Sequence, residues 1–140
     1  MNNHAHYPSI SGKVVFITGG ASGIGRAMVK AFAAQAAKIA FIDINNEAAQ
    51  SLIASLPNAK LWFRQVDVTD SNALQQSLVD ACAELGAINV LVNNVANDRR
   101  QASEDVTVQD WDQCLQINLN PAFFASQVAM SFMKSEGAGS

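Results

Sequence analysis

The stretch TGGASGIGRA holds glycines in a G-x-x-x-G-x-G spacing: Gly19, Gly23 and Gly25. It joins an apolar run, 13–17, to an Ala-rich segment with helical periodicity. A glycine turn between a strand and a helix leaves unpaired N–H groups at the helix N-terminus, where a pyrophosphate can bind. The alternative interpretation is a turn that binds nothing. A P-loop is excluded, because Arg26-Ala27 follows the last glycine where that motif has Lys and Ser or Thr.

One acidic residue, Asp43, ends the second predicted strand, 18 residues beyond Gly25. In dinucleotide-binding folds, an acid at this place accepts hydrogen bonds from the hydroxyls of the adenosine ribose. A carboxylate repels a 2′-phosphate, and residues 44–46 contain no Arg or Lys to bind one. The prediction is therefore NAD rather than NADP. The alternative is an acid that only stabilises a helix N-terminus.

Apolar runs and helical periodicity alternate along the chain. Strands are expected at 13–17, 38–43, 60–68 and 88–94. Helices are expected at about 24–35 and at 71–85, and a further helix is expected to run from a cap at Asn45 or Asn46 to Pro57. A long helix is expected at 107–133; Thr107 and Asp110 have the spacing of a capping box at its start, and Pro121 is expected to bend it. This alternation predicts parallel strands joined by right-handed crossovers. The expected fold class is α/β, a doubly wound parallel sheet with helices on both faces.

The composition is that of a globular protein of one domain, with 140 residues, 49% of them hydrophobic and 15% charged. A net charge of −3 argues against nucleic acid or an anionic membrane as a partner. No apolar run is long enough to span a bilayer, and the N-terminus lacks the apolar stretch of a secretory signal. A cytoplasmic protein is expected, with Cys82 and Cys114 reduced. His4 and His6 are interpreted as tail residues, and no metal site is expected.

The glycine spacing and three later stretches together resemble the short-chain dehydrogenase/reductase family. The stretches are Asp67-Val68-Thr69, Asn93-Asn94-Val95-Ala96, and Asn118 in the predicted long helix. The resemblance covers residues 12–140. Residues 1–12 are accordingly expected to form an N-terminal tail, and residues 13–140 a Rossmann-type NAD-binding domain.

The resemblance implies a role for each matching residue. Asn118 would be the family's catalytic Asn, which holds a water in the proton relay; its alternative role is a helix residue that binds backbone. The cofactor-binding residues would be Gly19, Ser22, Gly23, Ile24 and Gly25 at the pyrophosphate, Asp43 at the adenosine ribose, Asp67 and Val68 at the adenine, and Asn93 and Ala96 along the cofactor. The expected reaction is hydride transfer between NAD and a small alcohol or carbonyl substrate.

Two positions depart from the family's pattern. The usual Asn-Asn-Ala-Gly ends here in Val95-Ala96, so Ala96 adds a methyl group where the backbone passes the cofactor. Its continuation, ANDRR, is similar to a group that includes aldose (sugar) 1-dehydrogenases, which implies a monosaccharide substrate. Ala36 stands where the family has Gly at the end of the first helix. A left-handed cap at Ala36 costs about 1 kcal/mol relative to Gly.

The family's general base is a Tyr that is followed by a Lys four residues later, with a Ser that positions the substrate. The one tyrosine of these 140 residues is Tyr7, and Ser11 stands four residues after it. The chain is therefore expected to be the N-terminal half of such an enzyme, truncated before a fifth strand and inactive alone. The fourth strand would be an open edge, and self-association is expected there or through the 107–133 helix.

Two other functions remain open at this point. One is a non-catalytic nucleotide-binding or interaction module that uses the half-site alone. The other is a methyltransferase-like domain that binds an adenosyl cofactor through a similar acid. The glycine spacing and Asn118 argue against the second of these.

Overall fold

A four-stranded parallel sheet forms the centre of the chain, whose residues 5–140 the computed structural model describes. The strands lie in the order β3-β2-β1-β4 and are β1 (Val14–Thr18), β2 (Lys38–Asp43), β3 (Lys60–Gln65) and β4 (Val90–Val92). Phe16 of β1 lies opposite Ala40 of β2 and Leu91 of β4. The strand order therefore reverses beside β1, which confirms the predicted doubly wound α/β class.

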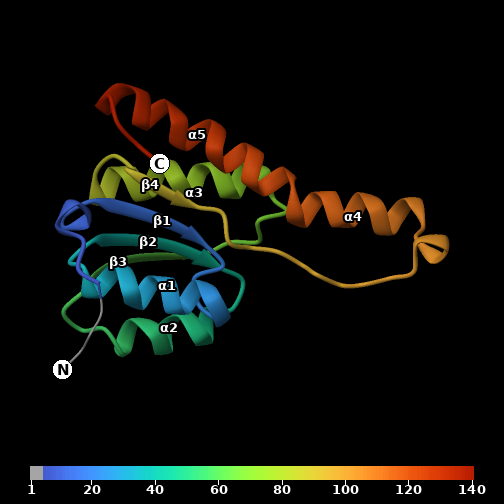
Figure 1. The fold of residues 1–140 in the computed structure, drawn as a ribbon, viewed down its shortest axis with the longest axis horizontal. Coiled ribbons are helices and arrows are strands. Elements are labelled where there is room, and N and C mark those ends of the chain that lie inside the picture. The colour runs from blue at the N-terminus through green and yellow to red at the C-terminus, as the bar shows by residue number, and fades with distance from the viewer. Residues whose placement is uncertain (1–4) are drawn as a thin grey trace.

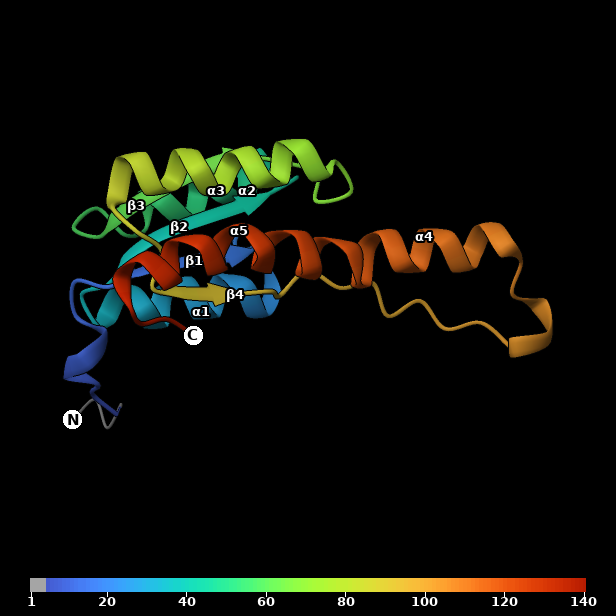
Figure 2. The same ribbon diagram turned by 90° about the horizontal axis from the view of Figure 1, so that it is seen from above.

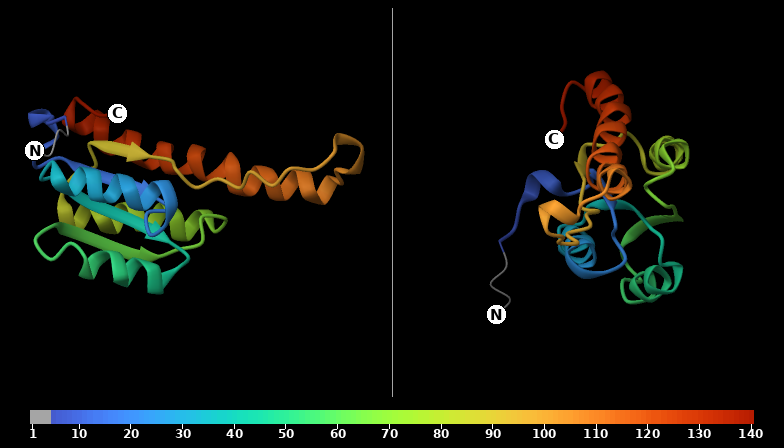
Figure 3. Two further views of the ribbon diagram at one scale, coloured as in Figure 1. Left: turned by 60° about the horizontal axis from the view of Figure 1, so that its bottom comes forward. Right: turned by 90° about the vertical axis from the view of Figure 1, so that its right-hand side faces the viewer.

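Helices cover both faces of the sheet (Figures 1 and 3). They are α1 (Gly23–Ala34), α2 (Asn46–Ala54), α3 (Ser71–Leu85), α4 (Val108–Asn118) and α5 (Asn120–Glu136). On one face, Val29 of α1 and Leu52 of α2 belong to one buried apolar cluster. On the other face, Leu78 of α3 and Ala125 of α5 belong to a second cluster. All five residues of β1 are buried, as expected for a central parallel strand.

Side-chain caps determine where two of the helices begin. The Asn45 side chain accepts a hydrogen bond from the Ala48 N–H at 2.9 Å, so Asn45 is the cap of α2. Thr107 and Asp110 form the predicted capping box of α4, in which each side chain accepts from the other residue's backbone N–H. The first residues of both helices can therefore be predicted from the residue types in the sequence alone.

Two strands end earlier than predicted. β3 ends three residues before the predicted limit at 68, because Asp67 begins a turn in which its side chain accepts from the Thr69 N–H at 2.9 Å. β4 ends two residues before the predicted limit at 94, because the Asn94 N–H donates to the Thr18 hydroxyl at 3.0 Å. In both cases a side chain replaces a neighbouring strand as the hydrogen-bond partner.

The helix predicted at 107–133 is wrong as a single element, because α4 and α5 are separated at Leu119. Pro121 has no N–H to donate to the Ile117 carbonyl, and its ring crowds the preceding turn. The two helices remain nearly in line, and α4 projects beyond the sheet beside the segment 93–107, which is extended except for a short 3-10 helix at Ser103–Asp105 (Figure 2). Trp111 is 60% exposed and Phe123 62% exposed along this arm. Pairing of two copies through it stays a prediction.

The N-terminal segment is held against the end of α1. The Gln35 side chain accepts from the Tyr7 N–H at 2.8 Å and donates to the Ala5 carbonyl at 2.9 Å. Ile10 packs against the apolar cluster beneath α1. The predicted tail is therefore part of the folded unit from residue 5 onward, whereas His4 lies outside the described residues.

The outer edge of β4 is paired with Ser140. The Ser140 N–H donates to the Asn89 carbonyl at 2.9 Å, and the Leu91 N–H donates to the Ser140 carbonyl at 2.9 Å. These two bonds form the pattern of a parallel bridge opposite Val90. The left-handed residue Gly137, with φ 71°, ends α5 and turns the chain back toward this edge. The predicted open edge is thus partly covered, and self-association across it stays a prediction.

Ala36 has the left-handed conformation predicted for it, with φ 59°. Because a Cβ disfavours this conformation and the side chain is exposed, Ala36→Gly is expected to raise the free energy of unfolding by about 1 kcal/mol in urea denaturation. Ala31→Gly is the control, since Ala31 is exposed inside α1, and it is expected to lower that energy by about 1 kcal/mol. A loss of stability in both variants would contradict strain at Ala36.

No helix within residues 5–140 is long and apolar enough to cross a membrane. The same residues contain no group of three or more His, Cys, Asp or Glu side chains placed to hold a metal ion. Cys114 is an exposed free thiol, and Cys82 is a half-buried one. Burial raises the pKa of the Cys82 thiol, which disfavours the reactive thiolate.

Candidate functional site

A cavity of about 710 Å³ opens at the carboxyl ends of the strands. Its walls come from the glycine loop after β1, the turns after β2 and β3, and the segment after β4. Open parallel sheets bind ligands at this edge, beside the point where the strand order reverses. Eight of the predicted cofactor residues line the cavity: Gly19, Ser22, Gly23, Ile24, Asp43, Asp67, Val68 and Ala96.

The glycine loop is open toward solvent at Gly23. This residue has φ 51°, and a Cβ built on it would meet no atom within 4 Å. Ser22 precedes α1 without a side-chain cap, and within residues 5–140 no group accepts from the N–H groups of Gly23 and Ile24. Unpaired N–H groups at the positive end of a helix form a binding site for an anion.

Gly25 is buried behind the loop and does not line the cavity. A Cβ on Gly25 would overlap the Gly19 carbonyl oxygen and lie 2.8 Å from Asn94 Nδ2. The residue therefore allows close packing of α1 against the end of β1. In dinucleotide-binding loops, the last glycine serves this close packing of the helix against the strand, and it makes no contact with the cavity.

Asp43 connects the glycine loop to the turn after β2. Its Oδ2 accepts from the Ala21 N–H at 2.9 Å, and its Oδ1 accepts from the Asn45 N–H at 2.9 Å. A carboxylate has about four lone-pair sites, so both oxygens keep the capacity to accept from ligand hydroxyls. Among residues 5–140, no Lys or Arg lines the cavity, whereas Asp43 and Asp67 both do.

Asp67 and Val68 form the wall of the cavity after β3. The Asp67 Oδ1 accepts from the Thr69 N–H at 2.9 Å and from the Thr69 hydroxyl at 2.8 Å, which fixes this turn. Val68 is 7% exposed and belongs to the buried cluster that contains Phe16. The turn thus presents one polar and one apolar side chain next to each other, a combination that suits a heterocyclic base.

Asn94 ties the glycine loop to the end of β4, a role that no local sequence pattern indicated. Its side-chain amide donates to the carbonyls of Thr18 at 3.0 Å and Gly19 at 3.1 Å. The Thr18 hydroxyl accepts from the backbone N–H of Asn94 at 3.0 Å and of Val95 at 3.2 Å. Asn94 and Val95 also line the cavity. Sequence reasoning chose their neighbours Asn93 and Ala96 instead.

Asn93 does not line the cavity, because its side-chain amide is directed to α5. It donates to the Ser126 hydroxyl at 3.3 Å. Ala96, the other residue predicted on this segment, does line the cavity. Other residues at the wall that sequence reasoning missed are Ile44, Asn45, Val66, Thr69 and Ile117. Four of these five directly follow or precede a predicted site residue, so proximity in sequence was the available signal.

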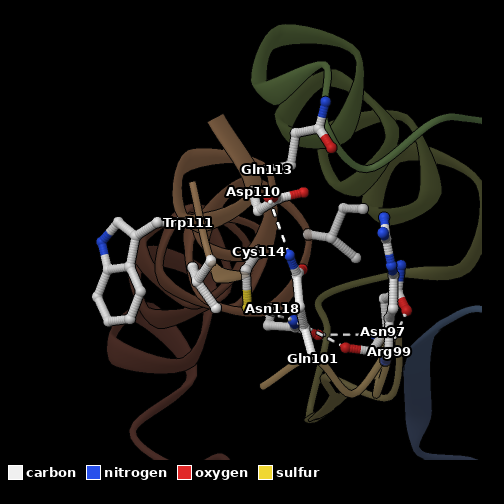
Figure 4. Close-up of a pocket in the computed structure, with 10 residues that line it drawn as sticks. Asn97, Arg99, Gln101, Asp110, Trp111, Gln113, Cys114 and Asn118 are labelled. Atoms are coloured by element: carbon white, nitrogen blue, oxygen red, sulfur yellow. Dashed lines mark hydrogen bonds between the residues drawn. The ribbon is translucent and has the colours of Figure 1, made fainter. Parts of the chain in front are cut away.

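Asn118 lines a second, smaller cavity between α4 and the segment 97–106 (Figure 4). Its Oδ1 accepts from the Asn97 N–H at 2.7 Å, and its Nδ2 donates to the Asn97 carbonyl at 3.0 Å. The structure thus shows Asn118 binding backbone, the alternative role considered for it, and a role in proton relay stays a prediction. Ile117 lines both cavities, so the two are adjacent.

Comparison with known proteins places this geometry in a family. The family model described as "short chain dehydrogenase" matches residues 13–140. The curated protein "Probable galactose dehydrogenase GalD" of Rhizobium meliloti is 40% identical over 139 residues, which are 97% of this chain and 54% of that protein. The D-xylose 1-dehydrogenase of Caulobacter vibrioides is 38% identical over 137 residues, which are 96% of this chain and 54% of that protein.

A solved structure agrees with the fold. The short-chain dehydrogenase/reductase from Serratia marcescens matches with a TM-score of 0.85 and 32% sequence identity, over 90% of this chain and 52% of that one. The chain spans about half the length of the curated relatives that it matches.

Proposed function

Because the chain belongs to the short chain dehydrogenase family, we propose that it binds NAD in the larger cavity and serves an oxidoreductase that exchanges a hydride with an alcohol or carbonyl substrate. The observation that carries this proposal is the pairing of two features across one cavity. The open glycine loop at the start of α1 fits a pyrophosphate, and Asp43 at the end of β2 fits a ribose diol.

The residues present fit the cofactor. Gly23 leaves free space where a side chain would stand, and the N–H groups that follow it are available to phosphate oxygens. Asp67 and Val68 offer a polar and an apolar contact to the adenine. When bound, NAD supplies the nicotinamide carbon that accepts the hydride. The chain's own residues hold the adenosine and pyrophosphate end in place.

NAD is preferred over NADP in this proposal because of charge. Of the residues that the structure describes, two carboxylates, Asp43 and Asp67, and no Lys or Arg line the cavity. A 2′-phosphate carries negative charge and would meet Asp43 with no cation to offset the repulsion. The 2′-hydroxyl of NAD instead donates a hydrogen bond to that carboxylate.

The proposed substrate is a small polyhydroxy alcohol or the corresponding aldose. The support comes from the relatives, which are named a galactose dehydrogenase and a D-xylose 1-dehydrogenase. The matched regions, at 40% and 38% identity, cover 97% and 96% of this chain. Asn118 would position the segment after β4 through its two hydrogen bonds to Asn97.

The tyrosine that serves the family as general base is not available at either cavity within the described residues. Oxidation of an alcohol needs a group that takes the hydroxyl proton while the hydride leaves the carbon. Tyr7 is bonded to Gln35, beyond the C-terminal end of α1, whereas the cavity lies at the N-terminal end. A helix of 12 residues is about 18 Å long, so Tyr7 is far outside hydrogen-bond reach of the site.

Binding calorimetry on the 140-residue chain tests the proposal. NAD is expected to bind, NADP to bind more weakly, and S-adenosylmethionine not to bind. Incubation with NAD and D-galactose or D-xylose is expected to give no NADH absorbance, because no tyrosine base followed by a lysine lies at the site. Absence of NAD binding would contradict the proposed function. Turnover by the 140-residue chain would contradict the argument about the base.

A further inference from the structure

The connection between β4 and α4, residues 93–107, is the longest one in the part of the chain that the structure describes. Every residue from 96 to 107 is exposed. The connection runs along the outside of α4, beyond the edge of the sheet (Figure 2). Exposed connections of this kind are the places where proteases cut folded proteins most readily.

Side chains hold the two ends of the stretch 98–100, whereas its own backbone is held by one bond. Asn118 bonds to both backbone groups of Asn97, at 2.7 and 3.0 Å. The Gln101 side chain donates to a backbone carbonyl of the same connection at 2.7 Å. Within residues 5–140, the backbone of 98–100 forms only the hydrogen bond from the Arg99 N–H to Asn97 Oδ1. Little local unfolding is therefore needed to bring this stretch into a protease.

Two arginines stand next to each other in this stretch, Arg99 and Arg100, and both are exposed. Trypsin-like endopeptidases bind an arginine or lysine side chain in a pocket that contains a carboxylate. Within the described residues, neither guanidinium forms a hydrogen bond or an ion pair with protein groups. Arg99 lines the smaller cavity, whereas Arg100 lines neither cavity. The Arg100 side chain is thus the freer of the two to enter such a pocket.

The other seven cationic side chains of the chain lie at poorly accessible backbone. Lys13, just before β1, has its N–H bonded to Ile10 at 3.1 Å and its carbonyl bonded to the Lys38 N–H at 2.9 Å. The residue after it, Val14, is buried. The remaining six lie within helices or strands: Arg26, Lys30, Lys38, Lys60, Arg64 and Lys134. Cleavage at any of these seven requires local unfolding first.

We propose that the pair Arg99-Arg100 is a processing site for a trypsin-like endopeptidase, which hydrolyses the peptide bond between Arg100 and Gln101. Water adds to the Arg100 carbonyl carbon and the C–N bond breaks. Arg100 then ends in a carboxylate, and Gln101 begins with a protonated amine. The bond after Arg100 is cut in preference to the bond after Arg99, because the Arg99 side chain lies at a cavity wall and its N–H is bonded to Asn97.

Contacts that cross the cut hold the two fragments, 1–100 and 101–140, together. Ala125 and Ala129 of α5 are buried in the cluster that also contains residues of β1, β2 and α3. Ser140 forms two backbone hydrogen bonds with the segment of β4. The product of cleavage is therefore a complex of two fragments with the sheet and its helices in place.

The cut separates the walls of the smaller cavity and leaves those of the larger one together. Asn97 and Arg99 line the smaller cavity from one fragment, and the rest of its lining belongs to the other fragment. Every residue that lines the larger cavity belongs to 1–100, except Ile117. The cleaved complex is therefore expected to keep the affinity of the chain for NAD. This last readout alone rests on the proposed function.

Limited digestion of the 140-residue chain with trypsin, followed by measurement of intact masses, tests the site. The first products are expected to be 1–100 and 101–140, which elute together in size-exclusion chromatography until a denaturant is added. A variant with both Arg99→Gln and Arg100→Gln is expected to be cut about tenfold or more slowly, because its remaining sites open only by local unfolding. Lys13→Gln is the matched control, and its first cut is expected at the same bond and the same rate as in the unchanged chain.

A first cut after any other lysine or arginine would overturn the proposal, as would equal rates for the double arginine variant and the Lys13→Gln variant. Fragments that separate without denaturant would contradict the two-fragment complex. Calorimetry with NAD keeps this test apart from the proposed function. Loss of NAD binding on cleavage would contradict the assignment of the cavity walls. A chain that fails to bind NAD before cleavage would contradict the proposed function, while the masses of the fragments still decide the cleavage site.

Discussion

Gly25→Ala is expected to lower the free energy of unfolding by about 3 kcal/mol and to abolish NAD binding. The added methyl group would overlap the Gly19 carbonyl oxygen and lie 2.8 Å from Asn94 Nδ2. Neither neighbour can yield easily. The Gly19 N–H is bonded to the Ile42 carbonyl at 2.8 Å, and the Gly19 carbonyl accepts from Asn94 at 3.1 Å. Either α1 moves away from the sheet or the bonds that hold the loop break.

Urea denaturation of the variant measures the first effect, and Gly23→Ala is the matched control. A Cβ on Gly23 meets no atom within 4 Å, so only its φ of 51° opposes the substitution, at about 1 kcal/mol. Gly23→Ala is nevertheless expected to weaken NAD binding, because the methyl group enters the space assigned to the pyrophosphate. Equal stability of the two variants would contradict the packing role of Gly25.

Local signals account for the parts of the fold that the sequence predicted correctly. The bounds predicted for β2, 38–43, are those observed, because an apolar run is followed directly by Asp43 and the cap Asn45. The start of α4 also follows from a local device, the capping box of Thr107 and Asp110. Periodicity and turn chemistry are properties of neighbouring residues, and a single sequence contains them in full.

Tertiary contacts account for what the sequence did not reveal. The Asn94 side chain bonds to Thr18 and Gly19, residues that are 76 and 75 positions away. Nothing near Asn94 indicates whether that residue or Asn93 faces the loop, since both are amides after the same strand. The cavity beside Asn118 depends in the same way on the pairing of α4 with the segment 97–106. Such pairings appear only when the chain is folded.

Asp43→Asn is expected to raise the Kd for NAD by about tenfold or more, while the Kd for NADP rises less or falls. The carboxylate is the proposed acceptor for the ribose hydroxyls, and hydrogen bonds to a charged group contribute about 1.5–3 kcal/mol each. An amide keeps one acceptor oxygen and loses the charge, so the repulsion of a 2′-phosphate falls as well. Calorimetry with both cofactors measures the two constants. Asp80→Asn is the control, because it removes the same charge on α3 beside Arg64, away from the cavity.

The ratio of the two constants decides between binding and positioning roles for Asp43. The Asp43 oxygens also accept from the Ala21 and Asn45 N–H groups. In Asp43→Asn, one of these two N–H groups loses its acceptor, which is expected to lower the free energy of unfolding by about 1 kcal/mol. Loosening of the loops weakens NAD and NADP binding alike, since both cofactors share the pyrophosphate. Loss of the carboxylate from a ribose contact changes the two unequally, because only NADP carries the 2′-phosphate. An unchanged ratio would therefore assign Asp43 to loop positioning alone.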